Sequence, residues 1–140
     1  MSKFTPAEIA YLRSQMLGRL ATVDGQGDLH VMPVNYRYNP EADAIDIGGL
    51  VIKATKKYRD AIRHGRVAFV VDDILPPGQA RLLEIRGTTQ AADEGGRDIH
   101  PDFQPDVLRV RPIYIVSAGI NEAFVGPREG KISFRGRHAE

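Results

Sequence analysis

Short strand-type segments separated by tight turns make up most of the chain, and this pattern constrains its fold most strongly. Residues 19–23 and 29–38 are two such segments, and Asp24-Gly25-Gln26-Gly27 between them is a typical hairpin turn. Residues 44–47 read Ala-Ile-Asp-Ile, an alternation that places both isoleucines on one face of a strand. Successive strands that are joined by hairpins form antiparallel sheets.

Three further segments continue this pattern. Residues 67–71 are apolar at every position, as in a strand that is covered on both faces. Residues 82–92 alternate between polar and apolar side chains. Residues 108–117 form the last strand-type segment, in which Pro112 predicts an edge or a bulge. Six strands with hairpin connections predict a mainly β fold, a six-stranded antiparallel β-barrel with short flanking helices.

The ends and connections of the chain carry patterns of their own. Residues 5–8 read Thr-Pro-Ala-Glu, a capping box with proline at the first helical position, and predict a short helix to about Gln15. Residues 93–106 are rich in glycine, proline and acids and predict a loop that can hold a short turn of helix. Residues 126–140 are polar and basic and predict a flexible tail. We expect a single domain over residues 1–140.

A second helix is predicted over residues 56–64, with Thr55 as its N-cap and Gly65 just past its end. Lys56 and Lys57 stand in its first turn, where unpaired N–H groups and the helix dipole favour anions over cations. Two lysines at this position become favourable when an anion binds, and phosphate is the obvious candidate. The alternative is a solvated basic face, because lysine side chains are usually exposed.

A proline interrupts the second predicted strand, in the stretch Met32-Pro33-Val34-Asn35. Because proline cannot donate to a strand ladder, Pro33 marks an edge, a bulge or a place where something other than a strand lies alongside. A flat ring system against this backbone would account for the proline. An ordinary edge strand is the plainer alternative.

Composition and charge argue against several classes of function. The formal net charge of +1 argues against nucleic-acid binding through bulk charge, and only Tyr36 and Tyr38 qualify as the exposed aromatics of an RNA-binding sheet. The absence of cysteine excludes disulfides, thiolate metal sites and a cysteine nucleophile, and it fits a cytoplasmic protein. No apolar run is long enough to span a bilayer, so no membrane partner is expected.

The usual catalytic constellations are missing from the sequence. The four histidines lie far apart without a second ligand at metal spacing, so no metal site is expected. Asp72 and Asp73 point to opposite faces of a strand. Ser117 lacks a nucleophile elbow, and no G-x-G-x-x-G or Walker pattern occurs. An enzyme with this sequence would take its chemistry from a bound cofactor, and its catalytic residues stay unassigned.

Four stretches occur in a specific order and spacing: Leu20-Ala-Thr-Val-Asp24, His30-Val-Met-Pro-Val34, Thr55-Lys-Lys-Tyr-Arg59 and Arg66-Val-Ala-Phe-Val70. Together they resemble the pyridoxamine-phosphate-oxidase-like split β-barrel family, which binds FMN or related cofactors. Within that family the match is to the small actinobacterial reductases that use the deazaflavin coenzyme F420. The resemblance covers residues 4–121. It implies a split barrel that forms a homodimer, with two cofactor sites in the grooves between the subunits.

The resemblance also implies which residues hold the cofactor. The residues that would bind its phosphate are Lys53, Thr55, Lys56 and Lys57. The residues that would lie along the flavin-like ring are Met32, Pro33, Val34 and Asn35. The segment from Ile115 to Asn121 of the partner subunit, including Ala118 and Asn121, would close the groove. Relatives often carry a tryptophan near Ala118 and this chain has none, which implies altered ring stacking and a roomier substrate pocket.

The activity implied by the resemblance is hydride transfer between reduced F420 and a conjugated small-molecule substrate. A proton would come from Asn35, Tyr36, Tyr114 or water. One alternative is an FMN-dependent oxidase or reductase, because its phosphate site would look alike. Another is a non-catalytic flavin- or haem-binding protein, since the missing tryptophan could signal lost activity. The residues do not identify the substrate.

Overall fold

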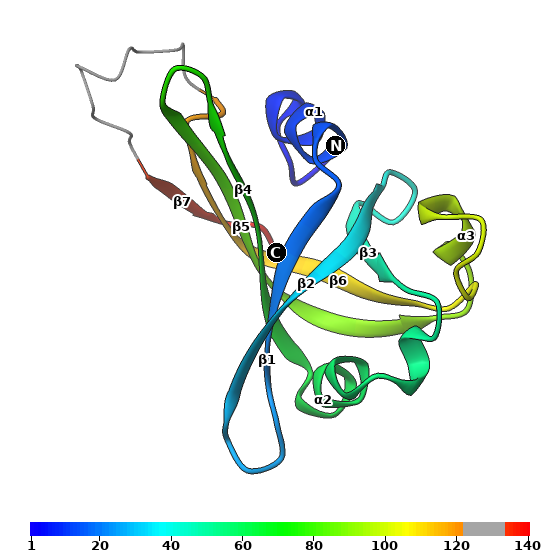
Figure 1. Cartoon of the computed structure of the whole chain (residues 1–140). Helices are drawn as coiled ribbons and strands as arrows, with labels where there is room; N and C mark the ends of the chain where they lie inside the picture. Colours follow the sequence, from blue (N-terminus) through cyan, green and yellow to red (C-terminus); the bar gives the residue numbers. More distant parts are fainter. Residues whose placement is uncertain (122–133) are drawn as a thin grey trace.

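The computed structural model describes residues 1–121 and 134–140, which form a mainly β fold with short helices around it (Figure 1). The strands are β1 (Leu17–Val23), β2 (Leu29–Asn39), β3 (Ala44–Gly48), β4 (Arg66–Leu75), β5 (Gln79–Ala92), β6 (Val107–Ala118) and β7 (Arg135–His138). The helices are α1 (Pro6–Ser14), the 3-10 helix η1 (Ile52–Ala54), α2 (Lys56–His64) and α3 (Gly96–Ile99). Within the described residues, no helix has the length and apolar character that a membrane span requires.

Six of the strands close into an antiparallel barrel. The sheet runs in the order β3-β2-β1-β4-β5-β6-β7, and a further pairing between β3 and β6 closes the ring. Residues 108–110 of β6 pair with β3, whereas residues 114–117 pair with β7. Strand β7 therefore extends the sheet outside the closed barrel. The six-stranded antiparallel barrel that the sequence predicts is confirmed.

Side chains fill the interior of the barrel. The fully buried apolar residues include Leu20, Ile45, Ile47, Phe69, Val71, Leu83, Ile85, Leu108, Val110 and Ile115. The Phe69 ring meets Tyr36 edge to face, with 5.2 Å between the ring centroids. A Cβ on Gly18 would lie 2.3 Å from the Phe69 ring, so only glycine lets β1 pass this close to the core. Because the interior is full, a sizeable ligand has to bind on the outer wall or at an interface.

Strand β4 differs from its prediction on one face. Val67, Phe69 and Val71 point into the barrel and are buried, whereas Ala68 and Val70 on the outer face are only half-buried. Among the described residues the strand is therefore covered on one face, and the apolar residues of its other face are only partly covered.

A bulge separates two parts of the long β5–β6 ladder. Arg86 pairs with Tyr114, but the next residue, Gly87, pairs with Pro112, so Ile113 is an extra residue on β6. Pro112 thus lies at the bulge, as its missing N–H group predicts.

The predicted helices form with their predicted caps. In α1 the Oγ1 of Thr5 accepts from the N–H of Glu8 at 3.1 Å, and the Glu8 carboxylate accepts from the N–H of Thr5 at 3.0 Å. Helix α2 begins after Thr55 and ends before Gly65, whose φ of 83° is left-handed. Helix α3 is the short helical turn expected within residues 93–106.

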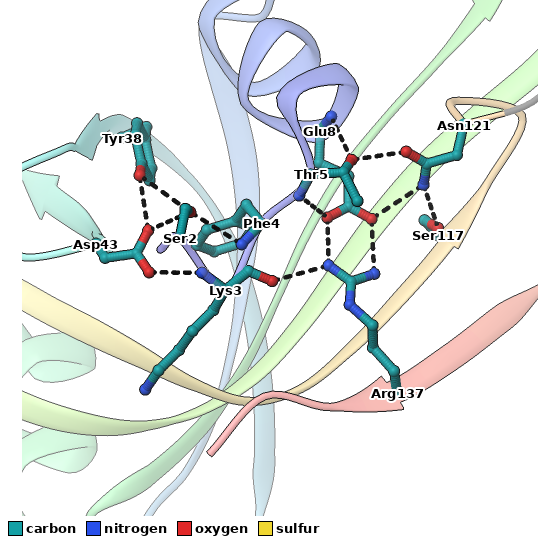
Figure 2. A network of polar contacts seen from close by, with 10 residues as sticks. All are labelled: Ser2, Lys3, Phe4, Thr5, Glu8, Tyr38, Asp43, Ser117, Asn121 and Arg137. Carbon is teal, nitrogen blue, oxygen red and sulfur yellow. Dashed lines mark hydrogen bonds and ion pairs between the residues drawn. The ribbon is translucent and has the colours of Figure 1, made fainter.

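The C-terminal residues differ from the predicted flexible tail. Residues 126–133 of that tail lie outside the described residues, but residues 135–138 form β7 on the edge of β6. From this strand Arg137 reaches the carboxylate of Glu8 in α1 (Figure 2). The polar and basic composition of these residues predicted a flexible tail. Composition carries no information on contacts between residues far apart in the sequence, so it could not predict β7.

Candidate functional site

A pocket of about 290 Å³ lies where the N-terminus of α2 meets the β1–β2 hairpin. The residues that line it are Thr22, His30, Met32, Thr55, Lys56, Lys57 and Asp60. Figure 1 shows α2 beside the lower part of the β1–β2 hairpin. We call this site the α2 pocket. It brings together four of the residues predicted to bind a cofactor, namely Met32, Thr55, Lys56 and Lys57.

The first turn of α2 offers backbone N–H groups to the pocket. The Oγ1 of Thr55 accepts from the N–H of Tyr58 at 3.3 Å, and its carbonyl accepts from the N–H of Arg59 at 3.2 Å. The N–H groups of Lys56 and Lys57 come before these and have no acceptor within the helix. The positive end of the helix dipole lies at the same place. This arrangement suits a phosphate group.

The two lysines of this turn differ in their partners. The Nζ of Lys56 lies 2.7 Å from Oδ2 of Asp60 and 3.8 Å from Oδ2 of Asp24. Asp60 also binds Arg63, with 3.0 Å between Oδ1 and Nη2. Among the described residues, Lys57 makes no ion pair or hydrogen bond. Lys56, Lys57 and Arg63 carry three positive charges here, and Asp24 and Asp60 carry two negative charges. One positive charge is therefore uncompensated, and Lys57 carries it.

Asp24 organises the hairpin side of the pocket. Its Oδ2 lies 2.8 Å from Nε2 of His30, and its Oδ1 accepts from the N–H groups of Gln26 at 2.9 Å and Asp28 at 3.0 Å. The hydrogen bond with His30 and those two backbone donors lower the pKa of Asp24 to about 2. Asp24 is thus charged at neutral pH and holds both His30 and Lys56 at the pocket wall.

Beyond the pocket, β2 presents an open edge. Its pairing with β3 begins only at Asn35, so within the part of the chain that the structure describes, residues 29–34 pair with β1 alone. Pro33 lies in this half-paired segment, as expected for a strand proline. Met32 is 50% exposed, whereas Val34 is buried in the core. Because neighbouring side chains on a strand point to opposite faces, a ring that touches both Met32 and Pro33 has to lie along the strand edge.

Lys53 lines a neighbouring pocket and is not part of the α2 pocket. Its Nζ lies 3.7 Å from Oδ1 of Asp106, and its N–H donates to Oε1 of Gln104 at 3.2 Å. The neighbouring pocket is polar and also includes Glu94 and Arg109. The four residues predicted to hold a phosphate are thus divided between two pockets.

Ala118 and Asn121 lie away from the α2 pocket. Ala118 is 2% exposed. The Nδ2 of Asn121 donates to Glu8 and to Ser117, each at 3.1 Å, and its Oδ1 accepts from Thr5 at 2.6 Å (Figure 2). These contacts place Asn121 beside α1, and Figure 1 shows α1 and α2 at opposite ends of the barrel. One chain alone does not bring these two residues to the α2 pocket.

The predicted proton donors occupy different environments. The hydroxyl of Tyr36 donates to the carbonyl of Leu12 at 2.6 Å inside the protein, and burial raises the pKa of Tyr36. The ring of Tyr114 lies 5.0 Å from the ring of His138 on β7. Asn35 is exposed and stands next to the open edge of β2. Asn35 does not line the α2 pocket, but it is the member of this set at the end of the half-paired segment of β2.

Sequence reasoning missed several residues of the α2 pocket. His30 was not among the residues predicted to bind the cofactor, yet it faces Thr22 across the β1–β2 ladder and lines the pocket with it. The hairpin register would have shown this pairing. The pairing of Lys56 with Asp60 follows a helical spacing of four residues. The contact of Asp24 with Lys56 connects the β1–β2 turn to α2, which are far apart in the sequence, so no local sequence pattern could have predicted it.

Among the described residues, no group of acids and histidines could hold a metal ion.

Comparisons with known proteins add independent findings. No family model matches the sequence. A curated relative, the 5a,11a-dehydrotetracycline/5a,11a-dehydrooxytetracycline reductase of Streptomyces rimosus, is 41% identical over 119 residues, which cover 84% of this chain and 84% of the relative.

Two solved structures share the fold at lower sequence identity. The FAD binding protein from Mycobacterium smegmatis has a TM-score of 0.61 and 22% identity, and the match covers 81% of this chain and 93% of that protein. An F420 reductase has a TM-score of 0.54 and 22% identity, and the match covers 71% of this chain and 88% of that protein.

Proposed function

Because the chain belongs to the pyridoxamine-phosphate-oxidase-like split-barrel family, we propose that it is an F420-dependent oxidoreductase. The reaction is the transfer of a hydride between the reduced deazaflavin and a conjugated small-molecule substrate. Oxidoreductase function is supported by the reductase relative and by the fold that the chain shares with an F420 reductase.

One observation carries the choice of cofactor site, namely the junction of an anion site and an open strand edge. The uncompensated charge of Lys57 and the free N–H groups of α2 suit a phosphate. The exposed Met32 and the half-paired segment of β2 lie beside it and suit a flat ring. A cofactor with a ring and a phosphorylated side chain would use both parts.

In this proposal the residues of the chain bind, orient and shield the cofactor. Thr55, Lys56 and Lys57 hold the phosphate, and residues 32–35 fix the ring along the edge of β2. Lys53 lies in the neighbouring polar pocket. In this proposal it meets an anionic extension of the cofactor beyond the phosphate. A reduced deazaflavin, when bound, supplies a hydride and reacts poorly with oxygen. A water molecule beside Asn35 would supply the proton at the neighbouring atom of the substrate, and the Asn35 amide would orient that water by a hydrogen bond.

We also propose that two copies of the chain form the complete site. The register of β1, β2 and β4 places Val31, Ala21 and Ala68 side by side on the outer face of the sheet. Val31 is 65% exposed and Leu29, on the same face, is 80% exposed. A second copy over this face would bury these side chains. The homodimer would also bring Ala118 and Asn121 of the partner subunit to the groove.

Turnover tests the proposed activity directly. The assay follows oxidation of reduced F420 by absorbance, with 5a,11a-dehydrooxytetracycline and 2-cyclohexen-1-one as separate conjugated substrates. Deuterium on the donor carbon of the reduced cofactor should appear in the product. Turnover with reduced FMN alone would favour the FMN-dependent alternative. Cofactor binding without turnover on any conjugated substrate would favour a non-catalytic binding protein.

A further inference from the structure

A second pocket, of about 370 Å³, lies between α1 and the β4–β5 hairpin, and we call it the α1 pocket. Figure 1 shows α1 near the end of this hairpin, away from α2. Its apolar lining includes Ala7, Ala10, Leu75 and Ile120, and its polar lining includes Gln79 and Arg81. It shares no lining residue with the α2 pocket. Its size falls within the range of small-molecule sites.

Gln79 is the most informative residue of the α1 pocket. The residue is 7% exposed, and among the described residues nothing forms a hydrogen bond with its side-chain amide. Among the described residues, every side-chain nitrogen or oxygen that is fully shielded from solvent has a hydrogen-bond partner. Because the Gln79 amide has no partner, its atoms are not fully shielded and meet solvent at the pocket surface. A Cβ on Gly119 would lie 3.0 Å from its Nε2, so the glycine leaves room for the amide. An unpaired amide in such a place is free to bind an occupant.

The charge of Arg81 is already compensated. Its Nε and Nη2 donate to the two carboxylate oxygens of Asp73 at 2.9 and 2.6 Å. The hydroxyl of Tyr11 also donates to Asp73, at 2.9 Å. Within the described residues, the Nη1 of Arg81 has no partner and can donate to a ligand. The pocket is therefore neutral, in contrast to the positively charged α2 pocket.

We propose that the α1 pocket binds a neutral, mostly apolar small molecule whose polar edge carries a hydrogen-bond donor next to an acceptor. A primary carboxamide has this edge, because one of its N–H groups lies beside its carbonyl oxygen. This edge forms two hydrogen bonds with the Gln79 amide, which has both a donor and an acceptor. Arg81 donates to the remaining lone pair of the ligand oxygen. The methyl groups of Ala7 and Ala10 leave space for the hydrocarbon part.

Salicylamide is the probe for this site, and salicylate is its anionic counterpart. We would titrate each into the ¹⁵N-labelled protein and follow the NMR signals of the Gln79 side-chain amide and of residues 119–120. Salicylamide should shift these signals, and salicylate should bind more weakly. Gln79→Leu should weaken salicylamide binding about tenfold, because the lost hydrogen bonds are worth about 1.4 kcal/mol. Gln26→Leu, in the exposed β1–β2 turn, is the matched control and should bind as the wild type does.

A second variant fills the pocket without touching the buried amide. Ala10 is on the exposed face of α1, so Ala10→Phe should fold normally and block salicylamide binding. Unchanged binding in this variant, or equal binding of salicylate by the wild type, would overturn the proposal. Lys57→Glu changes only the α2 pocket and should leave salicylamide binding unchanged. Failure of the cofactor proposal can therefore be distinguished from failure of this one.

Discussion

Glu8 of α1 and Arg137 of β7 form a two-pronged ion pair that joins the two ends of the chain (Figure 2). The Nη1 of Arg137 lies 2.9 Å from Oε2 of Glu8, and its Nη2 lies 2.5 Å from Oε1. Glu8 is completely buried, and Asn121 and the N–H of Thr5 also donate to its carboxylate. The pair fastens β7 and the end of β6 to α1.

Removing the arginine should destabilise the protein strongly. Arg137→Ala leaves the Glu8 carboxylate buried without its cation, which should lower the free energy of unfolding by about 3 kcal/mol at neutral pH. Urea unfolding followed by circular dichroism measures this difference. Arg97→Ala, at an exposed position in α3, is the control and should change stability by less than about 0.5 kcal/mol. A loss in Arg137→Ala no larger than in the control would mean that the pair contributes nothing.

The same pair should make stability depend on acid pH. Burial alone would raise the pKa of Glu8, but the bonds from Arg137, Thr5 and Asn121 outweigh it and hold the pKa below 4.5. A lowered folded-state pKa gives stability that is present above the unfolded pKa and is lost as the pH falls through the folded value. The stability difference between wild type and Glu8→Gln should therefore shrink as the pH is lowered from about 7 to 3. A difference that stays constant over this range would contradict the assignment.

Reversing the charge of Lys57 should abolish most cofactor binding and leave the fold intact. Lys57 carries the uncompensated charge of the α2 pocket, and its side chain has no partner among the described residues to lose. Lys57→Glu should weaken F420 binding by at least about tenfold, or 1.4 kcal/mol, with an unchanged melting temperature. Lys3→Glu makes the same change of charge far from the pocket and should bind normally. Equal affinities of the two variants would remove Lys57 from the site.

Neutralising Asp24 should have the opposite effect. Asp24→Asn keeps an oxygen for the N–H groups of Gln26 and Asp28 but removes the negative charge 3.8 Å from Lys56. The pocket gains one positive charge, so phosphate and F420 should bind more tightly at low salt, and the gain should fade as salt is raised. Isothermal titration calorimetry at two salt concentrations measures this. Weaker binding would mean that Asp24 acts mainly by positioning His30 and Lys56.

A charge on the outer face of β2 should disrupt the proposed dimer. Val31→Asp places a carboxylate at the centre of the exposed apolar face, where a second copy would bury it without a partner. Sedimentation velocity should show a dimer for the wild type and a monomer for the variant. A monomeric wild type would contradict the two-chain site and leave Ala118 and Asn121 without a role in it.

The sequence predicts most of the barrel because its signals are local. Alternation in residues 82–92, the turn at residues 24–27 and the cap at Thr55 each depend on near neighbours in the chain. Strand β7 was not predicted, because it is stabilised by its pairing with the edge of β6 and by the ion pair with Glu8, which is far away in the sequence. The site follows the same rule: the first turn of α2 was predicted, whereas the contact of Lys56 with Asp24 and that of Lys53 with Asp106 needed the tertiary structure.

Titration of the purified protein with F420 and, separately, with FMN tests the central claim most directly, with cofactor fluorescence as the signal. The account predicts a dissociation constant for F420 of about 1 μM or lower, which corresponds to about −8 kcal/mol, and clearly weaker binding of FMN. Preference for FMN would move the protein to the flavin-dependent alternative. Binding of neither cofactor would contradict the proposed redox function and leave only the barrel.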